Sequence, residues 1–169
     1  NKDEVLLPSL TYVATANVVM YCGAIPNFVD VDDDTLGVSP KKLEKYLKKS
    51  TKKKNNFSYN KKTGKKIAAL IAVHLYGLPC KIDEIKKICK KFNIILIEDA
   101  AEAMGSLFKG KHLGTFGQAG ILSFNGNKPI TCGGGGMIIT DNKNLAKKTL
   151  HLSTHAKKSN KPEHHHDDV

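Results

Sequence analysis

Two charged residues, Asp99 and Lys128, each follow a short apolar run and could act together on one ligand. Residues 94–97 are apolar throughout and lead into Glu98-Asp99, a pattern typical of a strand buried on both faces of a parallel sheet. Ligands of open α/β sheets bind just beyond the carboxyl ends of such strands. A second short strand, 121–124, leads into a glycine-containing loop that carries Lys128. A carboxylate and a lysine placed in this way suit a cofactor with a basic ring nitrogen and an aldehyde, as in pyridoxal phosphate (PLP).

Each of the two residues also has a simpler interpretation when taken alone. An aspartate after a strand is often a helix N-cap, and Ala100-Ala101 could begin a helix. A lysine in a loop is usually a solvated surface residue. The interpretation as a cofactor site therefore depends on the pair and on its position after two strands.

The motifs around this pair resemble the DegT/DnrJ/EryC1/StrS family of sugar aminotransferases. The resemblance rests on Glu98-Asp99-Ala100-Ala101-Glu102-Ala103, Ser123-Phe124-x-x-x-Lys128 and the glycine run 133–136, and it continues through 8–15, 28–32 and 74–77 in the family's order. It implies a PLP-dependent enzyme of fold-type I. It further implies an α/β fold with three α/β/α layers and a mostly parallel sheet.

The resemblance assigns roles to five residues. Lys128 is expected to form the Schiff base with PLP and to transfer a proton, and Asp99 to keep the pyridine nitrogen protonated. Ser123 is expected to bind the cofactor phosphate, with a strand-end hydroxyl as the alternative. Tyr12 is expected to stack on the cofactor ring, with a packing aromatic as the alternative. Glu102 is expected near the phenolic oxygen, where many relatives have glutamine; an ionised carboxylate only accepts hydrogen bonds.

The function that the resemblance implies is amino transfer, with glutamate as the expected donor, to a nucleotide-linked 4-keto-6-deoxy sugar for surface glycan or nonulosonic acid synthesis. The expected enzyme is a cytoplasmic homodimer. Segment 60–67 is similar to an insertion in the subgroup that acts on the route to legionaminic acid. A sister chemistry, sugar dehydration, uses histidine in place of the Schiff-base lysine, so Lys128 argues against it.

The net charge of +11 comes from one segment, because residues 41–66 hold twelve lysines and a single acid, Glu44. We predict that 48–66 is an exposed, solvated insertion. The alternative function is a truncated or degenerate non-catalytic module that binds polyanions or a partner through 41–66. The chain has no arginine, the usual reader of guanine and phosphate, so specific nucleic-acid recognition is not expected.

The chain as a whole alternates strands with helices, which predicts parallel βαβ units. Strands are expected at 4–7, 27–31, 67–73, 94–97, 121–124 and 137–140, and helices at 12–22, from Pro40, at 82–92 and at 142–151. We predict that 1–169 is part of the large PLP-binding domain, with a phosphate-binding turn before it and a small C-terminal domain after it. The four cysteines are expected to be free thiols, and no apolar run is long enough to span a membrane.

Histidines and the glycine run are further candidates for ligand sites. The run His164-His165-His166 has metal-binding residue types but no spaced partner, so no metal site is expected. His74 follows a buried strand and is a candidate to face the site. The glycines 133–136 lack the spacing of a phosphate-binding loop and are expected to form a tight turn.

Overall fold

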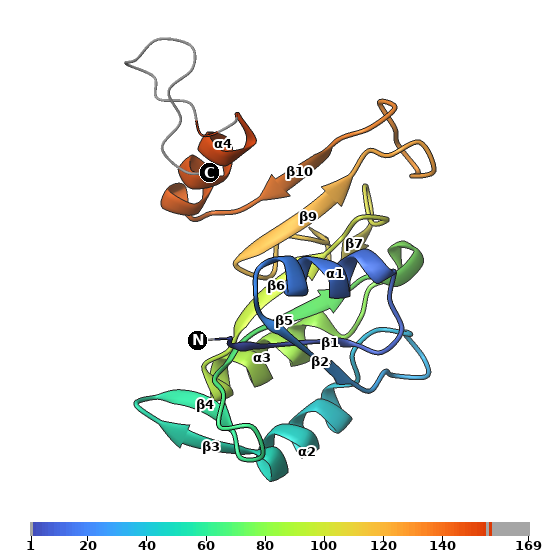
Figure 1. Ribbon diagram of the computed structural model, residues 1–169. Helices are drawn as coiled ribbons and strands as arrows, with labels where there is room; N and C mark the ends of the chain where they lie inside the picture. The colour runs from blue at the N-terminus through green and yellow to red at the C-terminus, as the bar shows by residue number, and fades with distance from the viewer. Residues whose placement is uncertain (1, 155, 157–169) are drawn as a thin grey trace.

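The computed structural model describes residues 2–154 and 156, and its centre is a six-stranded sheet (Figure 1). The strand order is β10-β9-β6-β5-β1-β2. The strands are β1 (Glu4–Pro8), β2 (Ile25–Val29), β5 (Ile67–Val73), β6 (Ile95–Asp99), β9 (Ala119–Ser123) and β10 (Gly136–Ile139). All neighbours pair in parallel except β9 and β10, which are antiparallel. The mostly parallel sheet confirms the predicted α/β fold.

Helices cover both faces of this sheet. The helices are α1 (Val13–Tyr21), α2 (Pro40–Ser50), α3 (Ile82–Phe92) and α4 (Lys143–Ser153), and the 3₁₀ turn η1 spans Leu75–Gly77. Figure 1 shows α1 on one face and α2 and α3 on the other, while α4 contacts β10. Helix α2 begins at Pro40 as predicted, and Ser39 caps it, because its side chain accepts a hydrogen bond from the backbone N–H of Lys42 at 3.4 Å.

The two faces of the sheet have separate cores because side chains alternate along each strand. Leu6 and Leu70 point to the side of α2 and α3 and pack with Ile85. Leu7 and Ile71, each one residue later, belong to the cluster on the side of α1. Burial on both faces explains why these strands are apolar at nearly every position.

Most element boundaries differ from the sequence expectation by one or two residues, and the starts of α1 and β2 are two examples. The helix expected at 12–22 begins at Val13, and its N-cap Tyr12 makes no capping hydrogen bond with its side chain. The strand expected at 27–31 lies two residues earlier as β2, and Val31 makes only an isolated bridge to Val38.

The lysine-rich segment 48–66 is a hairpin rather than an irregular loop. Helix α2 extends to Ser50, and β3 (Thr51–Lys54) then pairs with β4 (Phe57–Asn60) in antiparallel register. Asn55 and Asn56 both have positive φ, 48° and 63°, which suits a tight two-residue hairpin turn. Lys52, Lys53 and Lys54 are exposed, as expected of a solvated segment. Strand β3 has the sequence Thr-Lys-Lys-Lys, so it lacks the apolar alternation that would have indicated β-structure.

A buried carboxylate, that of Glu4, holds this hairpin against the sheet. Glu4 is 1% exposed. Its Oε2 accepts hydrogen bonds from Asn27 Nδ2 at 2.7 Å and Asn60 Nδ2 at 2.9 Å, and its Oε1 accepts one from the Thr63 hydroxyl. The hairpin is also tied to α3, because the Ser58 hydroxyl donates to the carbonyl of Phe92 at 2.6 Å.

Other expectations concern cysteines, membranes and metals. Cys80 and Cys89 are buried free thiols, and Cys22 and Cys132 are exposed free thiols, which confirms the prediction. Within residues 2–154, no helix has the length and apolarity to cross a membrane. The run 164–166 lies outside the described residues.

We predict that Asn60→Ala destabilises the full-length protein by about 1–3 kcal/mol, because a buried carboxylate loses one of its donors. Urea unfolding followed by circular dichroism measures this change. Lys53→Ala, on the exposed strand of the same hairpin, is the control and should change stability by no more than about 0.5 kcal/mol. Equal effects of the two substitutions would contradict the anchoring role of Glu4.

Candidate active site

Two of the site residues expected from the sequence, Asp99 and Ser123, lie at the carboxyl edge of the sheet. Asp99 ends β6 and Ser123 ends β9, and these two strands are parallel neighbours in which Asp99 pairs with Ile121. Both side chains therefore lie at the edge where open α/β sheets bind their ligands.

Asp99 is held by two hydrogen bonds that come from different directions. Its Oδ2 accepts from the Thr15 hydroxyl of α1 at 2.8 Å, and its Oδ1 accepts from the backbone N–H of Ala101 at 3.2 Å. Residues 100–106 form turns, so Asp99 is not the N-cap of a helix. Each carboxylate oxygen has a second lone pair, so Asp99 can accept a further hydrogen bond from a ligand.

Lys128 is not a solvated loop residue, because only 14% of its side chain is exposed. Its Nζ lies 3.6 Å from Oε1 of Glu102. The other oxygen of Glu102, Oε2, accepts from the backbone N–H of Tyr76 at 2.8 Å. The structure thus brings Glu102 and Lys128 together and fixes the carboxylate between the lysine and η1.

Ser123 and Tyr12 each keep a group that a ligand could contact. The Ser123 hydroxyl oxygen accepts a weak bond from the Asn125 N–H at 3.4 Å, so its proton remains available to donate. Tyr12 is 75% exposed and is not packed into the core. It precedes α1, whose Thr15 contacts Asp99.

A buried carboxylate beneath the site, that of Glu98, was not predicted. Glu98 is 0% exposed. Its Oε1 accepts from the N–H groups of Phe116 at 2.6 Å and Gly117 at 2.5 Å. Its Oε2 bonds to the N–H of Gly114 at 2.9 Å and Nε2 of His74 at 3.0 Å. The burial of Glu98 could have been predicted from the sequence, because side chains alternate along a strand and Glu98 and Asp99 therefore point to opposite faces of the sheet.

These contacts set the ionisation of the buried groups. Burial raises the pKa of Glu98, but the hydrogen bonds from His74, Gly117 and Gly114 together lower the pKa to below its ordinary 4.5. Burial, with the nearby charge of Glu98, raises the pKa of the Cys80 thiol to about 12. His74 lies in the core between Glu98 and Cys80 and does not face the site.

The chemistry of the residues at the strand ends fits PLP. The amine of Lys128 can bond to an aldehyde, and Asp99 can accept a hydrogen bond from a ring N–H. The hydroxyl of Ser123 can donate to a phosphate, and the exposed ring of Tyr12 offers a stacking surface.

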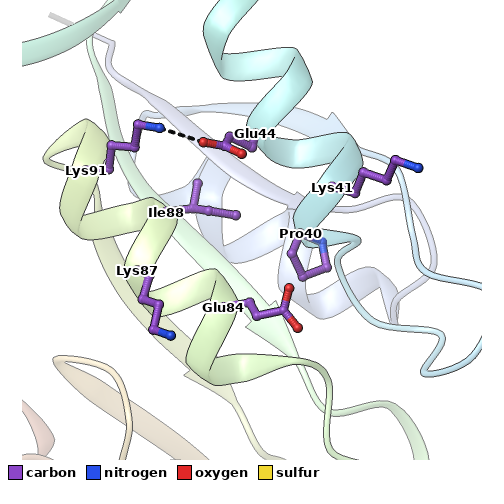
Figure 2. Close-up of a pocket in the computed structure, with 7 residues that line it drawn as sticks. All are labelled: Pro40, Lys41, Glu44, Glu84, Lys87, Ile88 and Lys91. Atoms are coloured by element: carbon purple, nitrogen blue, oxygen red, sulfur yellow. Dashed lines mark hydrogen bonds and ion pairs between the residues drawn. The ribbon is translucent and has the colours of Figure 1, made fainter.

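A hollow lies between α2 and α3 (Figure 2). Figure 2 shows Glu44 and Lys91 pointing toward each other across it, and their charged atoms are 2.7 Å apart. Both helices lie on the face of the sheet opposite α1. This hollow is therefore on the other side of the sheet from α1, whose Thr15 contacts Asp99.

We predict that Glu98→Gln lowers the stability of the full-length protein by about 3 kcal/mol at neutral pH, because the amide cannot accept from all four donors. The folded-state pKa of Glu98 is lowered, so its stabilising effect is complete above 4.5 and is lost as the pH falls through the folded-state value. Thermal unfolding measured at several pH values should show that the difference in Tm between Glu98→Gln and the unmodified protein becomes smaller in acid. Glu84→Gln, on the exposed face of α3, is the control and should show no such difference.

Comparison with known proteins places the chain in one family. A family model described as the DegT/DnrJ/EryC1/StrS aminotransferase family matches residues 1–168. GDP-perosamine synthase of Escherichia coli O157:H7 is 43% identical over 150 residues, which are 89% of this chain and 37% of that protein. The chain thus spans about a third of the length of this relative.

Solved structures agree with this match. The crystal structure of a DegT DnrJ EryC1 StrS aminotransferase from Brucella abortus has a TM-score of 0.84 and 31% identity, and the match covers 99% of this chain and 43% of that one. The E. coli GDP-4-keto-6-deoxy-D-mannose-3-dehydratase with bound hydrated PLP has a TM-score of 0.78 and 31% identity, over 96% of this chain and 38% of that one. The chain therefore belongs to the DegT/DnrJ/EryC1/StrS aminotransferase family, as the motifs around Asp99 and Lys128 predict.

Proposed function

We propose that the full-length protein is a PLP-dependent aminotransferase that aminates a nucleotide-linked keto-sugar, and that residues 1–169 are part of its large cofactor-binding domain. The observation that carries this proposal is the largely buried Lys128, held 3.6 Å from Glu102, at the sheet edge that Asp99 also occupies. A lysine that is removed from solvent and lies beside a fixed carboxylate is typical of a functional site, whereas a surface lysine is exposed to water.

Five side chains would hold the cofactor, and among them Glu102 would lie near its phenolic oxygen. Lys128 would bind its aldehyde carbon, and Asp99 would accept the hydrogen bond of its ring nitrogen. Ser123 would donate to its phosphate, and Tyr12 would cover its ring. When bound, PLP withdraws electrons from the carbon attached to the amino group that is transferred.

Lys128 would also act as the acid–base group of the reaction. Once its amine is released, it would take a proton from the donor carbon and return it to the carbon that bore the aldehyde. Glu102 would keep this amine close to the site. Because its other oxygen is engaged by the N–H of Tyr76, the Glu102 side chain is held in one orientation.

The proposed acceptor is a nucleotide-linked 4-keto-6-deoxy sugar. The matched E. coli dehydratase is named for such a compound, GDP-4-keto-6-deoxy-D-mannose, and the curated relative for GDP-perosamine. Lys128 favours amino transfer over dehydration. We propose glutamate as the donor, the cytoplasm as the location, and surface glycan or nonulosonic acid synthesis as the use of the product.

We predict that borohydride reduction of the full-length protein with PLP gives a stable adduct on Lys128. Lys128→Ala should lose this adduct and lower amino transfer more than about 10³-fold, because the covalent bond and the proton transfer are both lost. Peptide mapping locates the adduct, and conversion of glutamate to 2-oxoglutarate with a keto-sugar nucleotide measures turnover. Lys109→Ala, an exposed lysine, is the control. An adduct spread over surface lysines would contradict the assignment.

We further propose that the protein is a homodimer in which α1 contributes to the interface. Val13, Met20 and Tyr21 on this helix are 59%, 61% and 84% exposed, and apolar residues grouped on one exposed helix favour a covered surface. Sedimentation of the full-length protein should give a dimer, and Tyr21→Lys should shift it toward monomer. Lys45→Glu on the exposed side of α2 is the control. An undiminished dimer in Tyr21→Lys would remove α1 from the interface.

A further inference from the structure

A threonine in the first turn of α1 connects this helix to the proposed cofactor carboxylate. Thr15 is 4% exposed and lies 84 residues from Asp99 in the sequence. Its hydroxyl is 2.8 Å from Asp99 Oδ2 and 2.8 Å from the hydroxyl of Thr11. No role has been assigned to this threonine by the sequence motifs.

The direction of these two hydrogen bonds follows from proton counting. A hydroxyl has one proton to donate, and Thr15 donates its proton to Asp99. The bond between the two threonines must then run from Thr11 to Thr15. The result is an ordered chain in which Thr11 orients Thr15, and Thr15 holds one oxygen of Asp99.

The second oxygen of Asp99 is fixed independently by the N–H of Ala101. Two donors on different oxygens, one from α1 and one from the backbone after β6, restrict rotation of the carboxylate plane. Removing the Thr15 hydroxyl would leave one restraint, about which the carboxylate can turn.

The same helical turn also carries Tyr12. The Thr15 N–H donates to the carbonyl of Tyr12 at 3.1 Å, and residues three apart lie on one side of a helix. One turn of α1 therefore sets both the aromatic that would cover the cofactor ring and the hydroxyl that orients the partner of its nitrogen.

We propose that Thr15 is a positioning residue that fixes the Asp99 carboxylate toward the ring nitrogen of the cofactor, with Thr11 orienting the Thr15 hydroxyl. This inference rests on the proposed function, because it takes PLP as the ligand of Asp99. It adds a residue that touches neither cofactor nor substrate.

The test compares Thr15→Val, which keeps the shape and removes the hydroxyl, with Thr15→Ser, which keeps the hydroxyl. In the full-length protein, Thr15→Val should weaken PLP binding about tenfold, the worth of one hydrogen bond to a charged group. It should also move the pH at which the absorption spectrum of bound PLP changes. Thr15→Ser should restore both measurements to the unmodified values, and Thr11→Val should give a smaller change than Thr15→Val.

Controls separate positioning from stability. Thr35→Val is the matched substitution, because the Thr35 hydroxyl is buried without a partner among the described residues, and it should leave PLP binding unchanged. If Thr15→Val does not fold, Thr15→Ala, which favours the helix, replaces it.

The outcomes distinguish this inference from the proposed function. Failure to trap PLP on Lys128 in the unmodified protein would overturn the proposed function and the inference with it. Trapping on Lys128, together with unchanged affinity and pH profile in Thr15→Val or Thr15→Ala, would overturn the inference alone.

Discussion

The buried carboxylate of Glu98 is the contact on which the site edge of the sheet depends. An ionised group removed from water is tolerated only when it is fully hydrogen-bonded, and Glu98 meets this condition with three backbone N–H groups and His74. The N–H groups belong to residues 114–117, which lead into β9, and His74 follows β5. One side chain of β6 thereby connects the segment before β9 with the segment after β5. Because side chains alternate along a strand, Asp99 points to the opposite face, toward α1.

A second buried carboxylate, that of Glu4, also connects separate segments, at the opposite end of the sheet. Glu4 begins β1 and gathers donors from β2, from the end of the hairpin and from the turn that follows it. The lysine-rich hairpin is thus an ordered part of the fold, held at the amino ends of the strands, away from Asp99. This position explains how a segment with so much charge is accommodated without disturbing the site: its charges remain in water, while its polar anchors are buried.

The sequence predicted the sheet, the helices and the strand-end position of Asp99 because buried parallel strands leave long apolar runs that end abruptly. The position of Lys128 after a second apolar strand indicated a site, while the roles of Lys128 and Ser123 came from motif resemblance. Thr15 could not be found in this way, since a threonine in a helix with small residues carries no local signal and its partner is 84 residues away. The hairpin was missed because β3 has no apolar residue and β4 is only four residues long. The burial of Glu98 could have been inferred, because a strand that presents Asp99 to the site must turn the preceding residue to the core.

Three carboxylates lie within five residues, those of Glu98, Asp99 and Glu102, and each has a different set of partners. The three groups have the same chemistry, so their surroundings give them different roles. Glu98 faces backbone N–H groups in the core, and Asp99 faces the hydroxyl of Thr15. Glu102 lies in the turn beyond the strand and meets Lys128, whose loop is closed at its base by hydrogen bonds from Phe124 N–H to the Gly135 carbonyl and from Cys132 N–H to the Phe124 carbonyl. Gly133 and Gly135 have positive φ, 88° and 112°, so this closure needs glycine. The glycine run thus contributes to the site by returning the chain tightly into β10, which leaves Lys128 on a loop fixed at both ends.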